Sequence, residues 1–158
     1  MVPRRRSTSI PPVTEITIGS TLPEIAAVAK CCSEFAQHAR NDADALADLQ
    51  VAIDEVLSNA IRHAFPDGGA HPIDVRFRLS ASAVEVTIEY AGVAFDPAGA
   101  APPDLRSPLS ERREGGLGIH FVRQLMDETR YSRIGDRNQL TLTRRLKRRT
   151  GAGSDGTA

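Results

Sequence analysis

A polar stripe runs through an otherwise apolar stretch near the middle of the chain. The stretch is DEVLSNAIRHAF, residues 54–65, in which Glu55, Asn59 and His63 recur at every fourth position. Residues four apart lie on one face of an α-helix. A carboxylate there can act as a general base, and an amide oxygen suits Mg²⁺. Taken singly, the three are better explained as helix surface, a polar group bonded to a nearby loop, and a C-terminal helix cation.

A glycine cluster, GGLG at residues 115–118, opens directly into a predicted helix over residues 115–127. Glycines let a phosphate approach the backbone, and free N–H groups at a helix start supply donors. The spacing matches neither the Rossmann nor the P-loop pattern, and by itself such a cluster is more often a turn. Arg112 and Arg113 lie just upstream, and a guanidinium can neutralise a terminal phosphate, which favours phosphate binding.

A long segment without apolar periodicity, residues 91–114, precedes the cluster and is rich in Pro, Gly and Ala. Loops longer than about 12–15 residues are usually lids, binding loops or linkers. The segment begins with GVAFDP, in which Phe95 can anchor it, and it ends in the glycines. These two ends favour a lid over a floppy insertion.

The elements that must position these residues follow from hydrophobic periodicity. Their order is β-α-α-β-β-loop-α-β-β, which places helices beside a sheet made mainly of hairpins. We therefore expect an α/β two-layer sandwich, a mostly antiparallel mixed sheet covered by helices. The predicted strands span 13–19, 73–80, 83–90, 128–134 and 138–146, and the predicted helices span 22–39, 43–63 and 115–127.

Length and composition predict a single domain of ordinary globular character. The chain has 158 residues with 41% hydrophobic and 25% charged content, so we expect one domain over residues 13–147, with disordered tails at 1–12 and 148–158. No apolar run could span a membrane and no signal peptide pattern is present, so we expect a cytoplasmic protein. The adjacent Cys31 and Cys32 predict reduced thiols rather than a disulfide or a zinc site.

Charge is distributed unevenly along the chain although its net value is zero. Residues 7–143 hold 12 basic and 19 acidic residues, and the remaining basic residues lie near the ends. An acidic body without Trp disfavours direct binding of nucleic acid. The basic C-terminal segment could contact an acidic partner, although a solvated tail is the simpler interpretation.

Four segments together resemble one family. DEVLSNAIRHAF, GVAFDP, GGLGIHFVRQLMDETRY and RNQLTLTRRL, in this order, are similar to bacterial anti-sigma-factor serine kinases of the RsbW and SpoIIAB type. These kinases belong to the ATPase superfamily of gyrase, Hsp90 and histidine kinases, whose Bergerat-type fold binds ATP beneath a lid loop. The resemblance covers residues 13–147, and the joint occurrence of the four motifs makes it specific.

The resemblance implies an ATP site between the helical layer and the sheet. It makes Glu55 the general base and Asn59 the magnesium ligand. Gly92 corresponds to the adenine-contacting turn, and Gly116 and Gly118 correspond to the phosphate loop. Arg113 lies one residue from the position of the family's γ-phosphate arginine. The implied ATP-binding residues are Asn59, Tyr90, Gly92, Phe95, Arg113, Gly116, Leu117 and Gly118.

One position departs from the family pattern Asp-x-Gly-x-x-Phe, whose Asp accepts a hydrogen bond from the adenine amino group. Here Tyr90 stands in the Asp position, ahead of Gly92 and Phe95. Strand alternation turns the neighbouring Glu89 to the opposite face, so Glu89 is not expected to substitute. A phenol oxygen can accept a hydrogen bond, but the ring is bulkier and carries no charge.

The resemblance implies a partner-switching regulator that binds a sigma factor and phosphorylates a Ser or Thr of an anti-anti-sigma factor, a STAS-type antagonist, with Mg-ATP. A homodimer is expected by analogy. Two alternatives stay open. The chain could be a non-catalytic or nucleotide-impaired partner-binding module of the same fold, which Tyr90 favours, or an ATPase module with another substrate.

Overall fold

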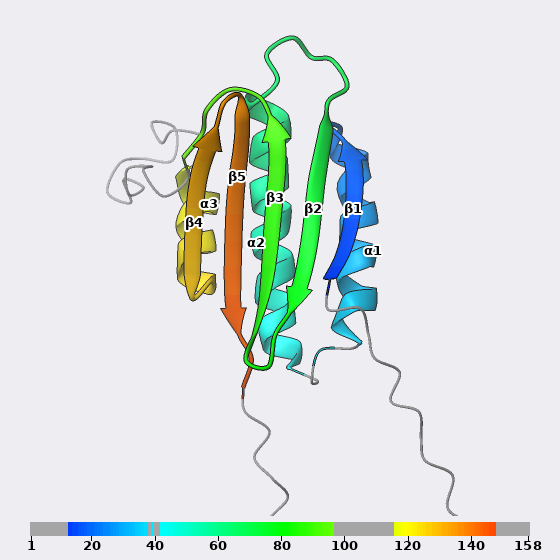
Figure 1. The fold of residues 1–158 in the computed structure, drawn as a ribbon, viewed down its shortest axis with the longest axis vertical. Helices are drawn as coiled ribbons and strands as arrows, with labels where there is room; N and C mark the ends of the chain where they lie inside the picture. Colours follow the sequence, from blue (N-terminus) through cyan, green and yellow to red (C-terminus); the bar gives the residue numbers. More distant parts are fainter. Residues whose placement is uncertain (1–12, 38, 40–41, 97–115, 148–158) are drawn as a thin grey trace, which may run out of the picture.

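A five-stranded sheet forms one layer of the protein and three helices form the other (Figure 1). The structure is a computed structural model that describes residues 13–37, 39, 42–96 and 116–147. The helices are α1 (Ile25–Ala36), α2 (Ala43–His63) and α3 (Gly116–Leu125), with a 3₁₀ turn, η1 (Leu22–Glu24), before α1. The strands are β1 (Val13–Gly19), β2 (Pro72–Leu79), β3 (Ala83–Ala91), β4 (Glu128–Ile134) and β5 (Arg137–Arg145).

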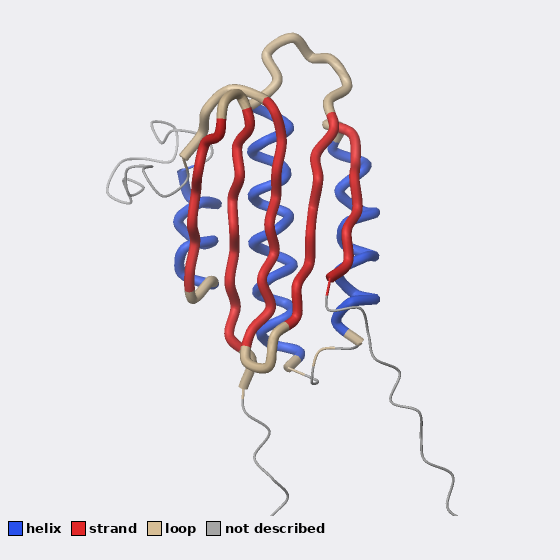
Figure 2. Tube along the Cα trace, viewed as in Figure 1, coloured by secondary structure: helices blue, strands red, loops and turns tan. Residues whose placement is uncertain are grey.

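The strands lie in the order β1-β2-β3-β5-β4, and each neighbouring pair is antiparallel. The predicted two-layer α/β class is therefore confirmed. The sheet was predicted to be mixed, but it is antiparallel over the described strands. The hairpins β2–β3 and β4–β5 each supply one antiparallel pair, and β5 pairs antiparallel with β3 to join them. Figure 2 shows the three helices behind the sheet, with the front of the strands uncovered by any described element.

The start of the helical layer differs from its prediction as one helix over 22–39. The chain first makes the tight turn η1, in which the Glu24 N–H donates to the Thr21 carbonyl over 3.1 Å, and only then continues as α1. Pro23 has no N–H to donate, so it is tolerated only in this first turn. Helix α2 spans the predicted 43–63, and its first N–H groups are capped by Asp42, which accepts from Ala45 N at 3.1 Å.

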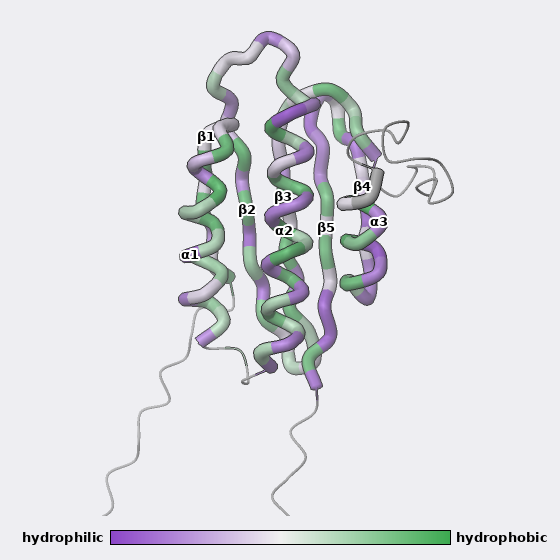
Figure 3. Tube along the Cα trace, turned by 180° about the vertical axis from the view of Figure 1, so that it is seen from behind, coloured by the Kyte–Doolittle hydropathy of each residue, from purple (hydrophilic) through white to green (hydrophobic). Residues whose placement is uncertain are grey.

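The core lies between α2 and the inner face of the sheet. Strand β3 alternates buried and half-buried residues along its whole length, the pattern of a strand with one face on a core. Figure 3, seen from the helix side, shows hydrophobic and hydrophilic segments alternating along the three helices. Fully buried large side chains from both layers fill this space, among them Leu49, Ile53, Leu57, Ile73, Phe77, Ile88 and Leu142.

Two sequence expectations concern features outside the site. Cys31 and Cys32 are free thiols, as predicted, and burial raises the pKa of the Cys32 thiol to about 11. No helix within the described residues is long and apolar enough to cross a membrane. The tails at 1–12 and 148–158, most of the lid segment and Arg113 lie outside the described residues.

Candidate functional site

The polar stripe of α2 faces inward at Glu55 and Asn59 but not at His63. Glu55 is half-buried, while Asn59, one turn further along the helix, is only 6% exposed. The amide nitrogen of Asn59 has no hydrogen-bond partner among the described residues. An unpaired buried amide costs free energy, which a ligand bound there can recover. His63 is exposed in the last turn of α2 and does not share the burial of Asn59.

The N-terminus of α3 meets this stripe. Gly116 and Leu117 form the first turn of α3, and Gly118 follows them. A Cβ atom placed on Gly118 would overlap the Glu55 carboxylate. Glycine at position 118 therefore leaves room for the Glu55 carboxylate, which lies against the first turn of α3, the positive end of the helix dipole. The structure thus brings Glu55 and the predicted glycine cluster together.

A small cavity lies beside this contact, between the two layers. It is lined by Val56 from α2, Ile119 from α3, Tyr90 and Leu140 from the sheet, and Phe95. Its volume is about 10 Å³, room for no more than a single water molecule. Two of the predicted binding residues, Tyr90 and Phe95, therefore do line one cavity, but it is nearly filled by their own side chains.

Tyr90 is 4% exposed, and its ring meets the Phe65 ring edge-on at a centroid distance of 5.8 Å. Burial, and to a lesser degree the neighbouring Tyr131, raises the pKa of the Tyr90 hydroxyl to about 12, so the phenol is neutral at physiological pH. Glu89 lies on the opposite face, as alternation predicted, where it pairs with Arg137 at 3.7 Å. No carboxylate from β3 therefore points into the cavity.

The turn after β3 is held by residues that sequence reasoning did not single out. Asn138 is 1% exposed and lies directly opposite Tyr90 on β5. Its Nδ2 donates to the Val93 carbonyl at 3.2 Å, and its Oδ1 accepts from Tyr131 Oη at 2.7 Å and from Arg133 at 3.0 Å. The signal was present in the alternation of β5, where Asn138 occupies an inward position otherwise taken by leucines.

Gly92 lies at the tightest point of this turn. Its carbonyl accepts from Arg133 at 2.9 Å, and a Cβ placed on Gly92 would lie 2.7 Å from the Ala64 carbonyl oxygen. The next N–H, that of Val93, donates to the same Ala64 oxygen over 2.9 Å. The end of β3 is thus fastened directly to the end of α2, and a side chain at position 92 would force them apart.

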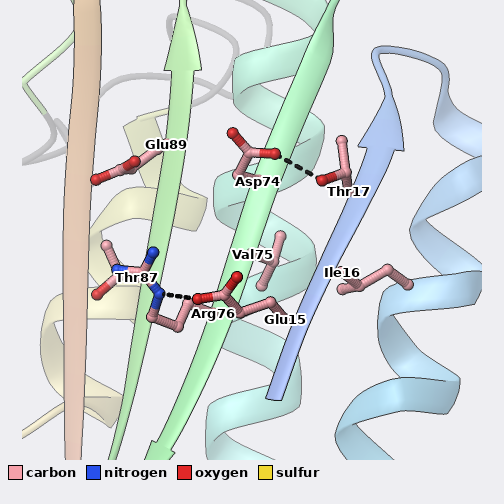
Figure 4. Close-up of a pocket in the computed structure, with 8 residues that line it drawn as sticks. All are labelled: Glu15, Ile16, Thr17, Asp74, Val75, Arg76, Thr87 and Glu89. Carbon is pink, nitrogen blue, oxygen red and sulfur yellow. Dashed lines mark hydrogen bonds and ion pairs between the residues drawn. The ribbon is translucent and has the colours of Figure 1, made fainter. Parts of the chain in front are cut away.

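A larger hollow lies on the other face of the sheet (Figure 4). Its volume is about 230 Å³, and it is lined by residues of β1, β2 and β3. Its carboxylates already have partners: Arg76 contacts Glu15 at 2.5 Å and Thr17 donates to Asp74 at 2.7 Å. These polar groups are already bonded to one another, and the stripe of α2 lies on the opposite side of the sheet. The hollow is therefore a weaker candidate for a ligand site than the stripe of α2.

The stripe and the helix start suit a magnesium-bound phosphate chain better than a metal ion alone. No cluster of three His, Cys, Asp or Glu side chains able to hold a metal occurs in the described part of the chain. Asn59, however, is buried and incompletely bonded, and a half-turn about its χ2 bond exchanges the amide ends and presents the oxygen. Gly116 and Gly118 carry no side chain that would hold a phosphate away from the backbone at the start of α3.

Comparison with known protein families gives a match over most of the chain. The sequence profile of the family described as "Histidine kinase-like ATPase domain" matches residues 18–144. The chain belongs to this family. The match includes α2, the cavity residues and α3, so the contact between Glu55 and Gly118 lies inside the histidine kinase-like ATPase domain.

Among curated relatives, a "Serine-protein kinase RsbW" of Oceanobacillus iheyensis is 30% identical over 91 residues, 55% of this chain and 58% of the relative. Another, from Halalkalibacterium halodurans, is 26% identical over 122 residues, 75% and 74% of the two chains. The chain spans less than two thirds of the length of the first of these. A solved structure of the RsbU and RsbW domains of a Mycobacterium tuberculosis protein has a TM-score of 0.63 to this chain at 22% sequence identity. The match covers 87% of this chain and 33% of that one, and it shows that the two share a fold.

Proposed function

We propose that this chain is a protein serine/threonine kinase of the RsbW type. It binds a sigma factor, and it phosphorylates a Ser or Thr of an anti-anti-sigma antagonist with Mg-ATP. The names of the curated relatives support the kinase activity, and the resemblance of the four motifs supports the partners. A homodimer is part of the same proposal and rests on family analogy alone.

The observation that carries the proposal is the position of the Glu55 carboxylate against Gly118 at the N-terminus of α3. A general base must lie within hydrogen-bonding reach of the hydroxyl that attacks the phosphate. Phosphates bound at the start of α3 would place the terminal phosphorus close to Glu55. The arrangement therefore joins a candidate base and a candidate phosphate-binding helix start in one site.

In the proposed reaction, the hydroxyl oxygen of the partner's Ser or Thr forms a bond to the γ-phosphorus of ATP. Glu55 accepts the proton of that hydroxyl, and the bond from phosphorus to the bridging oxygen breaks, so that ADP leaves. The backbone N–H groups at the start of α3 hold the phosphate oxygens and orient the terminal group. Asn59 would hold Mg²⁺, which neutralises charge on the phosphates.

The kinase proposal is tested by incubating the chain with γ-labelled Mg-ATP and a candidate STAS-type antagonist. We expect label on a Ser or Thr of the antagonist, with transfer about 10²–10⁴-fold slower for Glu55→Gln. Glu34→Gln, at an exposed position of α1, is the matched control and should leave the rate unchanged. Release of inorganic phosphate without labelled protein would instead support an ATPase module with another substrate.

A second function is favoured by the burial of Tyr90 in the cavity beside Glu55. The chain would then be a non-catalytic, nucleotide-impaired module that retains the partner surface. Calorimetric titration of the chain with Mg-ATP separates the two. Absence of binding at millimolar ligand would support the module and contradict the kinase.

A further inference from the structure

The two ends of the candidate ATP site are built differently. At the phosphate end, the Glu55 carboxylate lies against Gly118 at the start of α3, and the buried Asn59 has an unpaired amide nitrogen. The other end is the cavity of about 10 Å³, whose helix side is formed by Val56 and Ile119, the residues that follow Glu55 and Gly118. Its remaining walls are Tyr90, Leu140 and Phe95. Small-molecule pockets typically measure about 300–1,000 Å³, so the cavity formed by these described residues has no room for a nucleobase.

The Tyr90 ring cannot easily be displaced, because its backbone is paired on both sides and the ring itself packs against another ring. Tyr90 is paired with Ile73 on β2 and with Asn138 on β5. Its ring lies edge-on against Phe65, which follows the end of α2. Moving the strand would break ladder hydrogen bonds on both sides, so only the side chain itself could move, and the adjoining cavity of about 10 Å³ is too small to receive the ring.

The turn that follows Tyr90 closes the same end of the site. Val93 donates to the Ala64 carbonyl at 2.9 Å, and Asn138 holds the Val93 carbonyl at 3.2 Å. Gly92 already lies too close to Ala64 for a Cβ atom to fit between them. Sheet and helix therefore cannot separate here without breaking these contacts, and the cavity cannot widen by a hinge at the turn.

Stacking of a base on Tyr90 is also excluded by its burial. A base stacks on an aromatic face that solvent can reach, and 96% of Tyr90 is covered because only 4% is exposed. The cavity beside the ring is too small for a base, and the faces of the ring are covered by other residues. The ring occupies the volume that a base would need between the two layers.

We propose that Tyr90 makes the phosphoryl-donor site of this chain indifferent to the base, so that the site recognises a magnesium-bound polyphosphate chain while the nucleoside remains outside. This inference rests on the proposed function for the identity of the donor. Tyr90 is then a specificity-determining residue. A base that is not enclosed contributes little binding free energy, because it keeps most of its contact with water.

The test is calorimetric titration of the full chain, in Mg²⁺, with ATP, GTP, UTP and inorganic tripolyphosphate. We expect the four dissociation constants to agree within about threefold, since all carry the same phosphate chain. ATP binding tenfold or more tightly than UTP and tripolyphosphate would overturn the inference, as would failure of all four to bind. Asn59→Ala should weaken the four ligands by the same factor, and an effect on nucleotides alone would also contradict it.

Two variants test whether Tyr90 is the cause. Tyr90→Ser removes the ring, and nucleotides should then bind at least tenfold more tightly relative to tripolyphosphate. Tyr90→Phe keeps the volume filled and should retain equal affinities. A folded Tyr90→Ser protein with unchanged affinity ratios would overturn the role of Tyr90. If the cavity left by Ser prevents folding, checked by circular dichroism, Tyr90→Leu repeats the test with a smaller loss of volume, and the wild-type titrations still decide whether the site is indifferent to the base.

The outcomes separate this inference from the proposed function. Equal binding of all four ligands, without phosphate transfer to any antagonist, would support base indifference and contradict the kinase. Transfer to the antagonist with a strong preference for ATP over GTP and UTP would support the kinase and contradict base indifference.

Discussion

The carboxylate of Glu55 lies where the side chain of residue 118 would begin, so Gly118 is the residue that admits it to the start of α3. Glu55 belongs to the polar stripe of α2, and Gly118 belongs to a glycine motif more than sixty positions later in the sequence. The structure brings the two residues into contact. The carboxylate needs a gap in the surface of α3, and the glycine supplies one. A methyl group added at Gly118 would therefore displace the carboxylate.

Gly118→Ala is therefore expected to displace the Glu55 carboxylate without unfolding the protein. The methyl group meets the end of a flexible side chain, and Ala favours a helix by up to about 1 kcal/mol over Gly. Misplacing a catalytic group by about 1 Å can cost about 10²-fold in rate. Phosphate transfer measured with labelled ATP should fall by about that factor, while the thermal midpoint holds or rises.

Gly69→Ala is the matched control for that substitution, since the nearest atoms to an added Cβ there lie at 3.4 Å, an ordinary contact. It should leave transfer unchanged. Equal rates for Gly118→Ala and wild type would show that the Glu55 position is not used in the reaction.

Asn138→Ala should destabilise the fold through the turn after β3. The substitution removes the acceptor of Tyr131 and Arg133 and the donor to Val93. Tyr131 is half-buried, whereas Arg133 and Val93 are exposed and can bond to water instead. We therefore expect a loss of about 1–3 kcal/mol in the free energy of unfolding. Urea denaturation measures it, with the exposed Ser132→Ala as a control expected to change stability by less than about 0.5 kcal/mol.

Stability should fall at alkaline pH through Tyr90. Its pKa is raised to about 12 in the folded protein, from an ordinary value near 10. Between these values the unfolded chain loses a proton that the folded protein keeps, so stability is complete below pH 10 and declines as pH rises towards 12. The wild type should therefore lose about 1 kcal/mol relative to Tyr90→Phe between pH 8 and pH 11.

Urea unfolding of both proteins across this range measures that difference, and the Cys32 thiol, which also titrates here, cancels because both proteins contain it. A constant difference would mean that the Tyr90 hydroxyl is solvated rather than buried.

Asp42→Ala should detach the start of α2 from the end of the sheet. The carboxylate accepts from Ala45 N at 3.1 Å and from Lys147 N at 2.8 Å, and these bonds lower its pKa. Loss of an N-cap typically costs about 0.5–2 kcal/mol. Because the pKa is lowered, the contribution is present above the ordinary Asp value near 4 and disappears as pH falls further.

Asp44→Ala is the control for the cap. Asp44 contacts Lys147 Nζ at 3.2 Å, but both side chains are mostly exposed. Exposed ion pairs contribute little, so its loss should change the unfolding free energy by less than about 1 kcal/mol. Similar losses for both variants at pH 7 would argue against the cap and for a general charge effect.

The sequence by itself determined the parts of this protein that depend on local geometry. The span of α2, the sharing of one face by Glu55 and Asn59, and the outward direction of Glu89 follow from the periods of helix and strand. The split between η1 and α1 follows from Pro23 but was missed, because one proline in a first turn is also compatible with an unbroken helix.

Only the tertiary structure decided how distant segments meet. The order β1-β2-β3-β5-β4, the contact of Glu55 with the position of Gly118, and the Asn138 bonds to the turn at Val93 all join residues far apart in the chain. The role of Tyr90 belongs here too. Its type was visible in the sequence, but whether a ring lines a pocket or fills it depends on the packing of two layers, since side-chain volume acts only against the atoms that surround it.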